Sequence, residues 1–491
     1  MTAACRRAEE VAPARGFFIN NEWRPVAGGR TIPVVAPAEG VVFAEISAGG
    51  AGEVAQAVAA ARHAFERGEW SRLSATERGR LLSRLGQLIL DNFEELAALE
   101  ARDCGKPMKT ARADIQAAAR YFEYYGGAAD KVHGEQIPFM RGYYVTGERE
   151  PLGVTGHIIP WNYPAQMIGR TLGPALAMGN ATVLKPAEDA CMTPLRIAEL
   201  AAEAGFPPGA MNVVPGFGHE AGAALSEHPG IDFIAFTGSP RVGVMIQTAA
   251  ARNHIGCVLE LGGKSPQIVF EDADLDAALP VIVGAIIQNA GQTCSAGARV
   301  LVQRSVWDKL MPRIAERFAG LRAGLPTDDP DLGPIISARQ KESVEGFIRR
   351  AREEGVPVIA EGARQDSAPA EGFYVAPTVF GPVPRDNSLA LDEVFGPVLA
   401  AIPFDDEEDA IELANGTDYG LIAGVWTRDT ARAFRVSRRV RAGQVYINAY
   451  GAGGGIELPF GGTRKSGHGR EKGFEALYEF SALKTLVIKH D

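Results

Sequence analysis

Residues 181–216 read ATVLKPAEDACMTPLRIAELAAEAGFPPGAMNVVPG, and this stretch decides the fold class. It passes from a β-rich run through the helically spaced segment PLRIAELAAEAG to a second β-rich run, MNVVPG. Similar β-rich runs lie on both sides of it: GVTGHIIP before, and DFIAFTG and GCVLELGG after. Strands that alternate with helices at this spacing predict a parallel sheet wrapped by helices, with ligands at the carboxyl ends of the strands.

A second alternating series runs from SPQIVF at residue 265 to AGQVYINA at residue 442. A chain of 491 residues is too long for one hydrophobic core, so we expect two or three domains, with a tight boundary near residue 260. The helices expected from apolar spacing are 51–67 and 76–103, which cover the first sheet, and 274–292, 338–354, 406–415 and 429–440 in the second series.

The composition is that of an ordinary globular protein, with 46% hydrophobic and 22% charged residues. The net charge is -10, and no Lys/Arg cluster forms a basic stripe, so we expect neither nucleic acid nor an anionic membrane as partner. The longest apolar run, 277–287, is too short to span a bilayer, and Arg6-Arg7 is followed by Ala-Glu-Glu, unlike a secretion signal.

The five cysteines are odd in number and include no C-x-x-C pair. Neither a disulfide framework nor a zinc site is therefore favoured, and we expect no metal and a cytoplasmic location. One cysteine is unusual: Cys294 lies in NAGQTCSAGARV, residues 289–300, among small and polar residues. Structural cysteines are usually buried among hydrophobes, so Cys294 is either a reachable nucleophile or an ordinary loop residue.

Two further motifs fall at the ends of expected strands. In PWNYP, residues 160–164, two prolines fix the direction of Asn162, which is a candidate oxyanion donor or a loop residue making a local turn. In LELGGKSP, residues 259–266, Glu260 stands between two leucines. Partial desolvation would raise its pKa and suit a general base, although an ordinary acid at a strand edge fits the pattern equally well.

Phosphate and ribose contacts are indicated at two other strand ends. Lys185 and Glu188 of LKPAED could hold ribose hydroxyls, or they could be solvated charges. Gly238 and Ser239 of FTGSPRVG stand where a strand gives way to a helix, and free backbone amides at a helix N-terminus bind phosphate. The G-x-G-x-x-G fingerprint is absent, and GFGHEAG fits it only loosely.

The motifs PWNYP, LKPAE, FTGS, LELGGKSP, GQTCSAG, DEVFGP and PFGGTRKSGHGRE stand in this order along the chain. Together they resemble the NAD(P)-dependent aldehyde dehydrogenase superfamily, and the resemblance covers residues 17–491. It implies an α/β fold with a Rossmann-like cofactor domain, a smaller α/β catalytic domain and a β-strand oligomerisation arm. The expected division is a cofactor domain of 1–124 and 147–259, a catalytic domain of 260–445, an arm of 125–146 and 470–491, and a return to the cofactor domain over 446–469.

The resemblance also implies roles. Cys294 attacks the aldehyde to give a thiohemiacetal and then a thioester, Asn162 and the Cys294 N–H stabilise the oxyanion, and Glu260 activates the hydrolytic water. NAD is expected as cofactor in preference to NADP, because a carboxylate at Glu188 repels a 2′-phosphate. The residues matched to NAD contacts are Ile159, Pro160, Trp161, Lys185, Glu188, Gly218, Phe236, Gly238, Ser239, Val242, Glu393 and Phe395. A homodimer or homotetramer is expected.

The substrate is a small aldehyde whose identity the motifs do not specify, and Tyr163, Met167 and Arg170 are candidate contacts. Succinic semialdehyde dehydrogenases resemble this chain at Arg170, where the arginine holds the substrate carboxylate; the alternative is an arginine paired inside the fold. Many relatives have tryptophan at that place, followed by a lysine that reaches the equivalent of Glu471; here the lysine is replaced by Thr171.

Three rival functions remain open from the sequence. A cysteine hydrolase would need a histidine linked to Cys294, and the eight histidines are scattered. A catalytically inactive binding protein of the same fold would have no need of Cys294, Glu260 and Asn162. A CoA-acylating semialdehyde dehydrogenase would transfer the acyl group to CoA, whereas Glu260 favours water.

Overall fold

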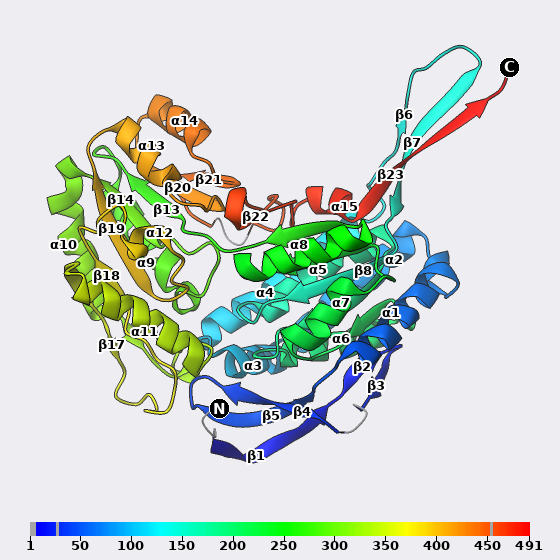
Figure 1. The fold of residues 1–491 in the computed structure, drawn as a ribbon, viewed down its shortest axis with the longest axis horizontal. Helices are drawn as coiled ribbons and strands as arrows, with labels where there is room; N and C mark the ends of the chain where they lie inside the picture. Colours follow the sequence, from blue (N-terminus) through cyan, green and yellow to red (C-terminus); the bar gives the residue numbers. More distant parts are fainter. Residues whose placement is uncertain (1–5, 26–28, 452–454) are drawn as a thin grey trace.

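The structure is a computed structural model that describes residues 6–25, 29–451 and 455–491, with only the backbone described for 6–13. Two large sheets, each covered by helices, lie side by side, and a narrow strand arm projects from one of them (Figure 1). Of the five cysteines in the sequence, Cys5 lies outside the described residues.

The first large sheet has eight strands. Five of them are parallel, in the order β12-β11-β8-β9-β10. Successive strands along the chain therefore run outward from β8 in one direction and then from β11 in the other, so the switch point of this doubly wound sheet lies between β8 and β11. The strands, in sheet order, are β22 (Gly467–His468), β12 (Gly256–Glu260), β11 (Phe233–Thr237), β8 (Val154–Ile159), β9 (Ala181–Pro186), β10 (Met211–Val213), β2 (Phe17–Ile19) and β3 (Glu22–Arg24).

Helices pack around this sheet: α1 (Ala51–Glu66), α2 (Ala75–Asp91), α3 (Phe93–Cys104), α4 (Met108–Ala128), α5 (Pro164–Met178), α6 (Met192–Ala204), α7 (Ala223–Glu227) and α8 (Pro240–Asn253). The single helix expected over 76–103 was wrong, because the chain forms two helices that meet at Asn92. The backbone N–H and the side-chain amide of Asn92 both donate to the Leu88 carbonyl, which ends α2. The apolar spacing continues across this break, so periodicity alone does not reveal it.

The second large sheet has seven strands, and all of its pairs are parallel except β16-β18. In sheet order they are β16 (Val358–Glu361), β18 (Thr378–Phe380), β19 (Val398–Phe404), β14 (Arg299–Gln303), β13 (Pro266–Val269), β20 (Ile422–Trp426) and β21 (Gln444–Ile447). Its helices are α9 (Leu275–Ile287), α10 (Arg304–Gly320), α11 (Ala338–Glu353), α12 (Ser388–Leu391), α13 (Glu407–Asn415) and α14 (Thr430–Arg439).

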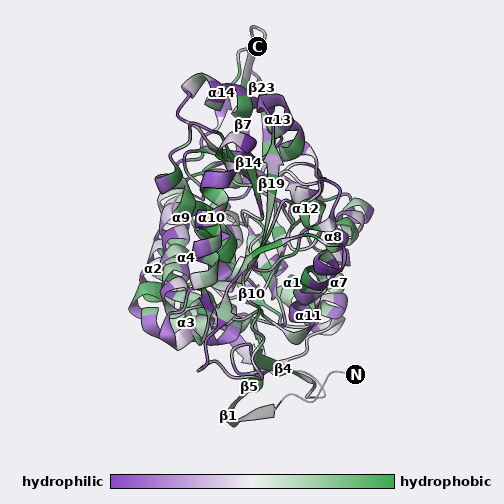
Figure 2. Cartoon of the chain, turned by 90° about the vertical axis from the view of Figure 1, so that its left-hand side faces the viewer, coloured by the Kyte–Doolittle hydropathy of each residue, from purple (hydrophilic) through white to green (hydrophobic). Residues whose placement is uncertain are grey.

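Each large sheet has its own hydrophobic core. Leu184 and Ile234 are fully buried in the first, and Ile268 and Val300 are fully buried in the second. Figure 2 shows helices such as α2 and α10 carrying both hydrophobic and hydrophilic residues, as expected when a helix buries one side against a sheet. No helix among the described residues is long and apolar enough to cross a membrane.

The arm is a three-stranded antiparallel sheet, β23-β7-β6, formed by β6 (Glu135–Gln136), β7 (Tyr143–Pro151) and the C-terminal β23 (Ser481–Lys489). β7 runs almost directly into β8, and β23 follows the short helix α15 (Glu475–Glu479). Asn180 ties both connections together, because its side chain accepts from the Gly153 N–H and donates to the Phe480 carbonyl. Two smaller sheets complete the fold: β1 (Arg6–Arg15), β5 (Val41–Ser47) and β4 (Thr31–Ala36), and β15 (Arg322–Ala323) with β17 (Ala363–Arg364).

Candidate active site

Cys294 lies in the loop between α9 and β14, and it is half-buried. The helix expected over 274–292 ends at Ile287, because Asn289, Ala290 and Gly291 all adopt left-handed backbone conformations. Gly291 is needed there, since a Cβ atom would stand 2.1 Å from the Gly396 carbonyl oxygen. The loop is thereby held against the segment that carries Glu393 and Phe395.

The two glycines after Glu260 bring three motifs into contact. A Cβ on Gly263 would lie 2.4 Å from the Cys294 carbonyl oxygen, and one on Gly262 would lie 2.1 Å from a Glu393 carboxylate oxygen. The Gly263 N–H also donates to Glu393 at 2.8 Å. Any side chain would separate these segments, so the Gly-Gly pair places Glu260, Cys294 and Glu393 in one site.

Asn162 follows β8 and joins the same loop from the first sheet. Its side-chain nitrogen donates to the Gln292 carbonyl at 2.9 Å, and its own carbonyl accepts from Asn289 at 3.0 Å. An amide nitrogen carries two N–H groups, so one remains for a substrate oxygen. The Asn162 side chain is almost fully buried beside the cysteine loop, as the oxyanion role requires.

Glu260 is buried at the end of β12 and lies in a cluster with Arg170 and Glu471. The Arg170 guanidinium forms ion pairs with both carboxylates, at 3.2 Å to Glu260 and in close contact with Glu471. Burial raises the pKa of Glu260 well above its ordinary value, and Arg170 opposes this rise. Burial disfavours the charge of Arg170 too, but the two carboxylates outweigh it and raise the arginine pKa. We name these three residues the Glu260 cluster.

The Glu260 cluster explains how the chain can have Thr171 where many relatives have a lysine. Arg170, rather than a lysine at the next position, reaches Glu471. Thr171 instead shares a hydrogen bond of 2.7 Å with the buried His157, whose other ring nitrogen contacts Thr155 at 2.8 Å. Burial lowers the pKa of His157 to about 3, so this histidine is neutral. Of the two interpretations of Arg170, the ion pairs favour the one in which it is paired inside the fold.

The buried surroundings of Cys294 disfavour ionisation of its thiol. Burial raises the pKa of its thiol to about 12, against which Arg170 and Lys472 act as nearby cations. Glu260 and Glu393 raise it further. Burial also raises the pKa of Glu393 to about 7, although the hydrogen bond from Gly263 opposes the rise. The charge balance around the sulfur therefore decides how much thiolate is present.

The predicted ribose contacts also come together. The Lys185 ammonium bonds one carboxylate oxygen of Glu188 at 2.8 Å, and the Gly218 N–H donates to the other at 3.3 Å. Burial raises the pKa of Glu188, but Lys185 outweighs this and holds it below the ordinary value. Glu188 is thus an ionised carboxylate at the carboxyl end of the sheet.

The predicted phosphate contacts lie at the N-terminus of α8. Ser239 is the N-cap residue, and its hydroxyl accepts from the Val242 N–H at 3.4 Å. Gly238 is required because a Cβ would stand 2.5 Å from the Phe236 ring. Ile159 ends the neighbouring strand β8, and Pro160 and Trp161 follow it, so the two groups flank the switch point between β8 and β11.

Side chains next to strands of the two large sheets meet near this switch point. The ring of Trp161, from the first sheet, stands edge to face with that of Phe395, from the second, at 5.5 Å between centroids. Phe395 has a left-handed backbone, and its carbonyl accepts from Gln340 at 3.1 Å. This region offers N–H groups at a helix N-terminus, a carboxylate and aromatic faces, a combination that fits a dinucleotide.

Two of the predicted substrate contacts differ in their surroundings. The hydroxyls of Tyr163 and Thr293 share a hydrogen bond of 2.8 Å directly beside Cys294, whereas Met167 is buried in the first core. Sequence reasoning missed Phe460, which packs in a small apolar cluster with Cys294, and Tyr450, whose hydroxyl donates to the Ser295 carbonyl. Phe460 stands in the motif PFGGTRKSGHGRE but was given no role from the sequence, whereas no local signal marks Tyr450.

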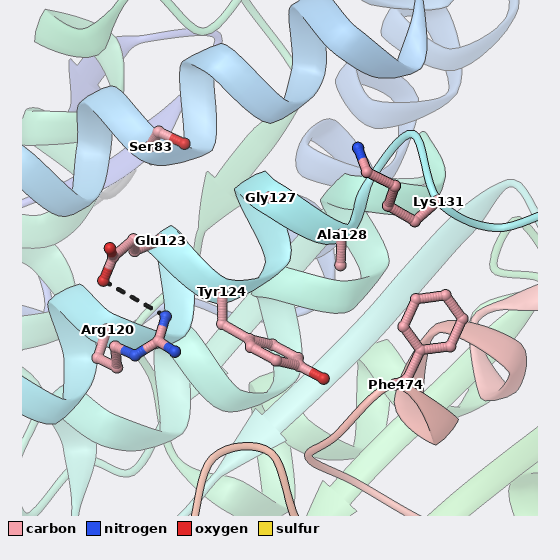
Figure 3. Close-up of a pocket in the computed structure, with 8 residues that line it drawn as sticks. All are labelled: Ser83, Arg120, Glu123, Tyr124, Gly127, Ala128, Lys131 and Phe474. Carbon is pink, nitrogen blue, oxygen red and sulfur yellow. Dashed lines mark hydrogen bonds and ion pairs between the residues drawn. The ribbon is translucent and has the colours of Figure 1, made fainter.

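A surface hollow of about 550 Å³ lies away from these residues, between α2, α4 and the start of α15 (Figure 3). Arg120 and Glu123 pair within it at 3.4 Å, and Tyr124 and Phe474 form part of its wall. None of the predicted site residues lines it, so it is separate from the Cys294 site.

Comparison with known proteins gives a single answer. Residues 23–486 match the model of the Aldehyde dehydrogenase family. The chain belongs to this family. A solved protein from Burkholderia cenocepacia, assigned to the aldehyde dehydrogenases, is 60% identical, with a TM-score of 0.96 over 97% of this chain and 100% of that one. The mitochondrial aldehyde dehydrogenase of Equus caballus is 43% identical over 96% of this chain and 95% of its own length.

An aldehyde dehydrogenase from Bacillus cereus was solved as an NAD⁺ complex; it is 41% identical, with a TM-score of 0.95 over 98% of this chain and 97% of that chain. The family, the fold class and the activity of an NAD-dependent aldehyde dehydrogenase, predicted from the sequence, are thereby confirmed. The roles of individual residues remain predictions.

Proposed function

We propose that this family member oxidises a small aldehyde to the carboxylic acid with Cys294 as nucleophile, Glu260 as general base and Asn162 as oxyanion donor. One observation carries the proposal. The Gly262-Gly263 contacts and the Asn162 hydrogen bonds bring segments far apart in the chain to the same cysteine loop. Such a nucleophile, base and amide donor are the components that acyl chemistry requires.

The chemistry follows from these positions. The Cys294 sulfur attacks the carbonyl carbon, and the oxyanion receives hydrogen bonds from Asn162 and the cysteine N–H. As the oxyanion re-forms the C=O bond, hydride leaves the same carbon and a thioester remains on Cys294; NAD, when bound, would be the acceptor of that hydride. Glu260 then takes a proton from water as the water oxygen attacks the thioester carbon; the carbon–sulfur bond breaks, the acid leaves and the thiolate is restored. Glu260 must be ionised for this step, so its raised pKa makes deacylation slow at low pH.

NAD would be held at the switch point between β8 and β11. Ser239, Gly238 and the α8 N-terminus suit the pyrophosphate, and Lys185 with Glu188 suits the adenosine ribose. An ionised Glu188 accepts hydrogen bonds from a 2′-hydroxyl and repels a 2′-phosphate by roughly 1–4 kcal/mol per charge pair at about 4 Å. We therefore propose NAD over NADP. The ring of Phe395 and the carboxylate of Glu393 would face the nicotinamide end.

Arg170 is engaged by two carboxylates, so we propose that it serves the Glu260 cluster and does not hold a substrate carboxylate. Tyr163, which contacts Thr293 beside Cys294, is the better candidate for a wall of the aldehyde site. Profiling kcat/KM over succinic semialdehyde, glycolaldehyde, betaine aldehyde, benzaldehyde and hexanal would identify the preferred class. A preference for the acid-bearing aldehyde over a neutral one of equal length would contradict this assignment of Arg170.

We further propose a homodimer or homotetramer built through the arm. Leu483, Val487 and Ile488 of β23 and Tyr144 of β7 are large apolar side chains left exposed in a single copy. Such surfaces favour association with another chain. The domain division given with the sequence is retained as a proposal, with its parts in 1–5, 26–28 and 452–454 outside the described residues. So is the cytoplasmic location, for which the four described cysteines, all free thiols, are the support.

The test is NADH formation by the purified protein with aldehyde and NAD, with and without CoA. Wild type should form NADH and the free acid without CoA. The Cys294→Ala variant should form none while it still binds NAD, because the thiol performs the chemistry and the cofactor contacts lie elsewhere. NADH formation that requires CoA would replace hydrolysis by acyl transfer, and activity in Cys294→Ala would remove the nucleophile assignment.

A further inference from the structure

Lys472 follows Glu471 directly and has an unusual backbone. Its φ is 61°, in the left-handed region that side chains other than glycine rarely adopt. The flanking backbone fixes it there: Phe460 and Glu471 exchange two hydrogen bonds, and the Gly473 N–H donates to the Ile456 carbonyl at 2.7 Å. A lysine in this conformation costs about 1 kcal/mol relative to an unstrained residue. Glycine would avoid that cost, so the presence of lysine indicates that its side chain has a function.

The lysine side chain is directed toward the reaction centre. Its ammonium lies 5.0 Å from the centre of the Phe460 ring, and the Arg170 guanidinium lies 4.4 Å from the same ring. Phe460 in turn packs in the apolar cluster that contains Cys294. Lys472 and Arg170 therefore share one aromatic neighbour with the predicted nucleophile.

Lys472 and Arg170 are two cations that lie near Cys294. In the Glu260 cluster one guanidinium faces two carboxylates, which leaves a surplus negative charge if all three groups are ionised. A negative surplus beside a buried thiol opposes its ionisation. Arg470 and Lys472 are further cations near Glu260, and Lys472 also lies near Cys294. Lys472 is half-buried, so solvent screens its charge only in part.

We propose that Lys472 favours ionisation of the Cys294 thiol, by adding a positive charge beside the carboxylates of the Glu260 cluster. The proposal rests on Cys294 being the nucleophile. Ionisation releases the thiol proton to water, and the sulfur keeps the electron pair that attacks the aldehyde. Lys472 acts through charge and touches no reacting atom, so it is a positioning residue.

The titratable groups around the pair are consistent with this role. Beside Cys294 are Arg170, Glu260, Glu393 and Lys472, and the hydroxyl groups of Tyr163 and Tyr450 also lie within electrostatic range. Lys472 itself is faced by Arg170, Glu260, Glu471 and Cys294. Burial and then Arg170 lower its pKa to about 7, while Cys294, Glu471 and Glu260 favour its charge. The Lys472 charge therefore lowers the pKa of the Cys294 thiol, and the thiolate in turn raises the pKa of Lys472.

The test is the pH dependence of Cys294 alkylation by iodoacetamide, a neutral reagent, on the full-length protein without aldehyde or NAD. The alkylated Cys294 peptide is quantified by mass spectrometry, because Cys257 is also partly exposed. In Lys472→Met we expect the apparent thiol pKa to rise by about one pH unit, so that alkylation at pH 7 slows about tenfold. Lys472→Arg should restore the rate to within about twofold, because it restores the charge.

Lys309, exposed on α10, provides the matched control, since Lys309→Met changes the net charge equally and should leave the alkylation profile unchanged. Thermal melting and NAD binding verify that each variant is folded. Superimposable wild-type and Lys472→Met profiles overturn the proposal, as does Lys472→Arg behaving like Lys472→Met. An unchanged profile with a raised KM for succinic semialdehyde alone would make Lys472 a substrate contact instead. Failure of the proposed function is separate: it appears as aldehyde oxidation that survives in Cys294→Ala.

Discussion

Replacement of Arg170 by methionine tests the Glu260 cluster most directly. Methionine is similar in length and keeps the apolar contacts, but it removes the charge that faces Glu260 and Glu471. Both carboxylates are about 1% exposed and the arginine is 7% exposed, so water cannot take the place of the guanidinium. Removing one partner of a buried ion pair costs roughly 3–5 kcal/mol of stability, against about 0.2–1 kcal/mol for an exposed pair.

This loss should depend on pH. Burial already raises the pKa of Glu260, and loss of Arg170 raises it further. A carboxyl group with a raised folded-state pKa holds its proton more tightly when folded, so the protein loses stability as pH rises above the ordinary pKa near 4.5. Urea midpoints of Arg170→Met should therefore fall further below wild type at pH 8 than at pH 5.5. Arg120→Met, which removes an exposed arginine paired with Glu457, should change the midpoint little at either pH.

Catalysis should change in a matching way. A higher pKa leaves less ionised Glu260 at pH 7, so steady-state turnover should fall about tenfold for each pH unit by which the pKa rises, and it should recover toward pH 9. A burst of NADH should still precede the slow step, because hydride transfer comes before the base-dependent step, but its rate should fall since Arg170 also lowers the pKa of the Cys294 thiol. Arg170→Lys should retain part of the stability and rate. The reasoning is refuted if turnover of neutral aldehydes is unchanged at all pH values while KM rises only for acid-bearing substrates.

Three further variants probe the rest of the site. Glu260→Gln should keep a single burst of NADH in stopped-flow measurements but slow steady turnover at least about a hundredfold; equal loss of both phases would give Glu260 another role. Glu188→Gln should reduce the preference for NAD over NADP in kcat/KM, and equal use of both cofactors by wild type would show that Glu188 does not contact the ribose. Gly263→Ala should lower kcat about a hundredfold with modest loss of stability, because its Cβ would lie only 2.4 Å from the Cys294 carbonyl oxygen and would push the cysteine loop away. Full activity in this variant would contradict the close packing.

The sequence was informative wherever a residue acts next to a strand end. Cys294, Glu260 and Asn162 stand in short motifs with glycine or proline beside them, and such local constraints can be read directly from the chain. The predicted cofactor contacts Lys185 and Glu188 are of the same kind, because Lys185 stands at the end of β9 and Glu188 follows soon after the strand. For these residues the structure adds distances to positions that were already expected.

Features that depend on distant partners could not be read in this way. Nothing around Arg170 in the sequence shows that Glu471, far along the chain, bonds it, so the substrate and structural interpretations remained equal. The break at Asn92 was missed because apolar spacing continues past it. The left-handed turn over 289–291 was missed because it depends on close packing against the distant Gly396. Lys472, which stands between Glu471 and Gly473 in GREKG, was given no role from the sequence.

The arm is anchored on both sides of the reaction centre. β7 passes into β8, whose end carries Asn162, while β23 follows the segment that carries Glu471 and Lys472, and Asn180 bonds both anchoring points. The arm is therefore not an interchangeable module. A chimaera that takes its arm from a relative has to import the β7–β8 junction and the segment around Glu471 together. A tag fused after Asp491 is attached to a strand that begins next to Phe480, which packs in one cluster with Val258 of the strand that ends at Glu260.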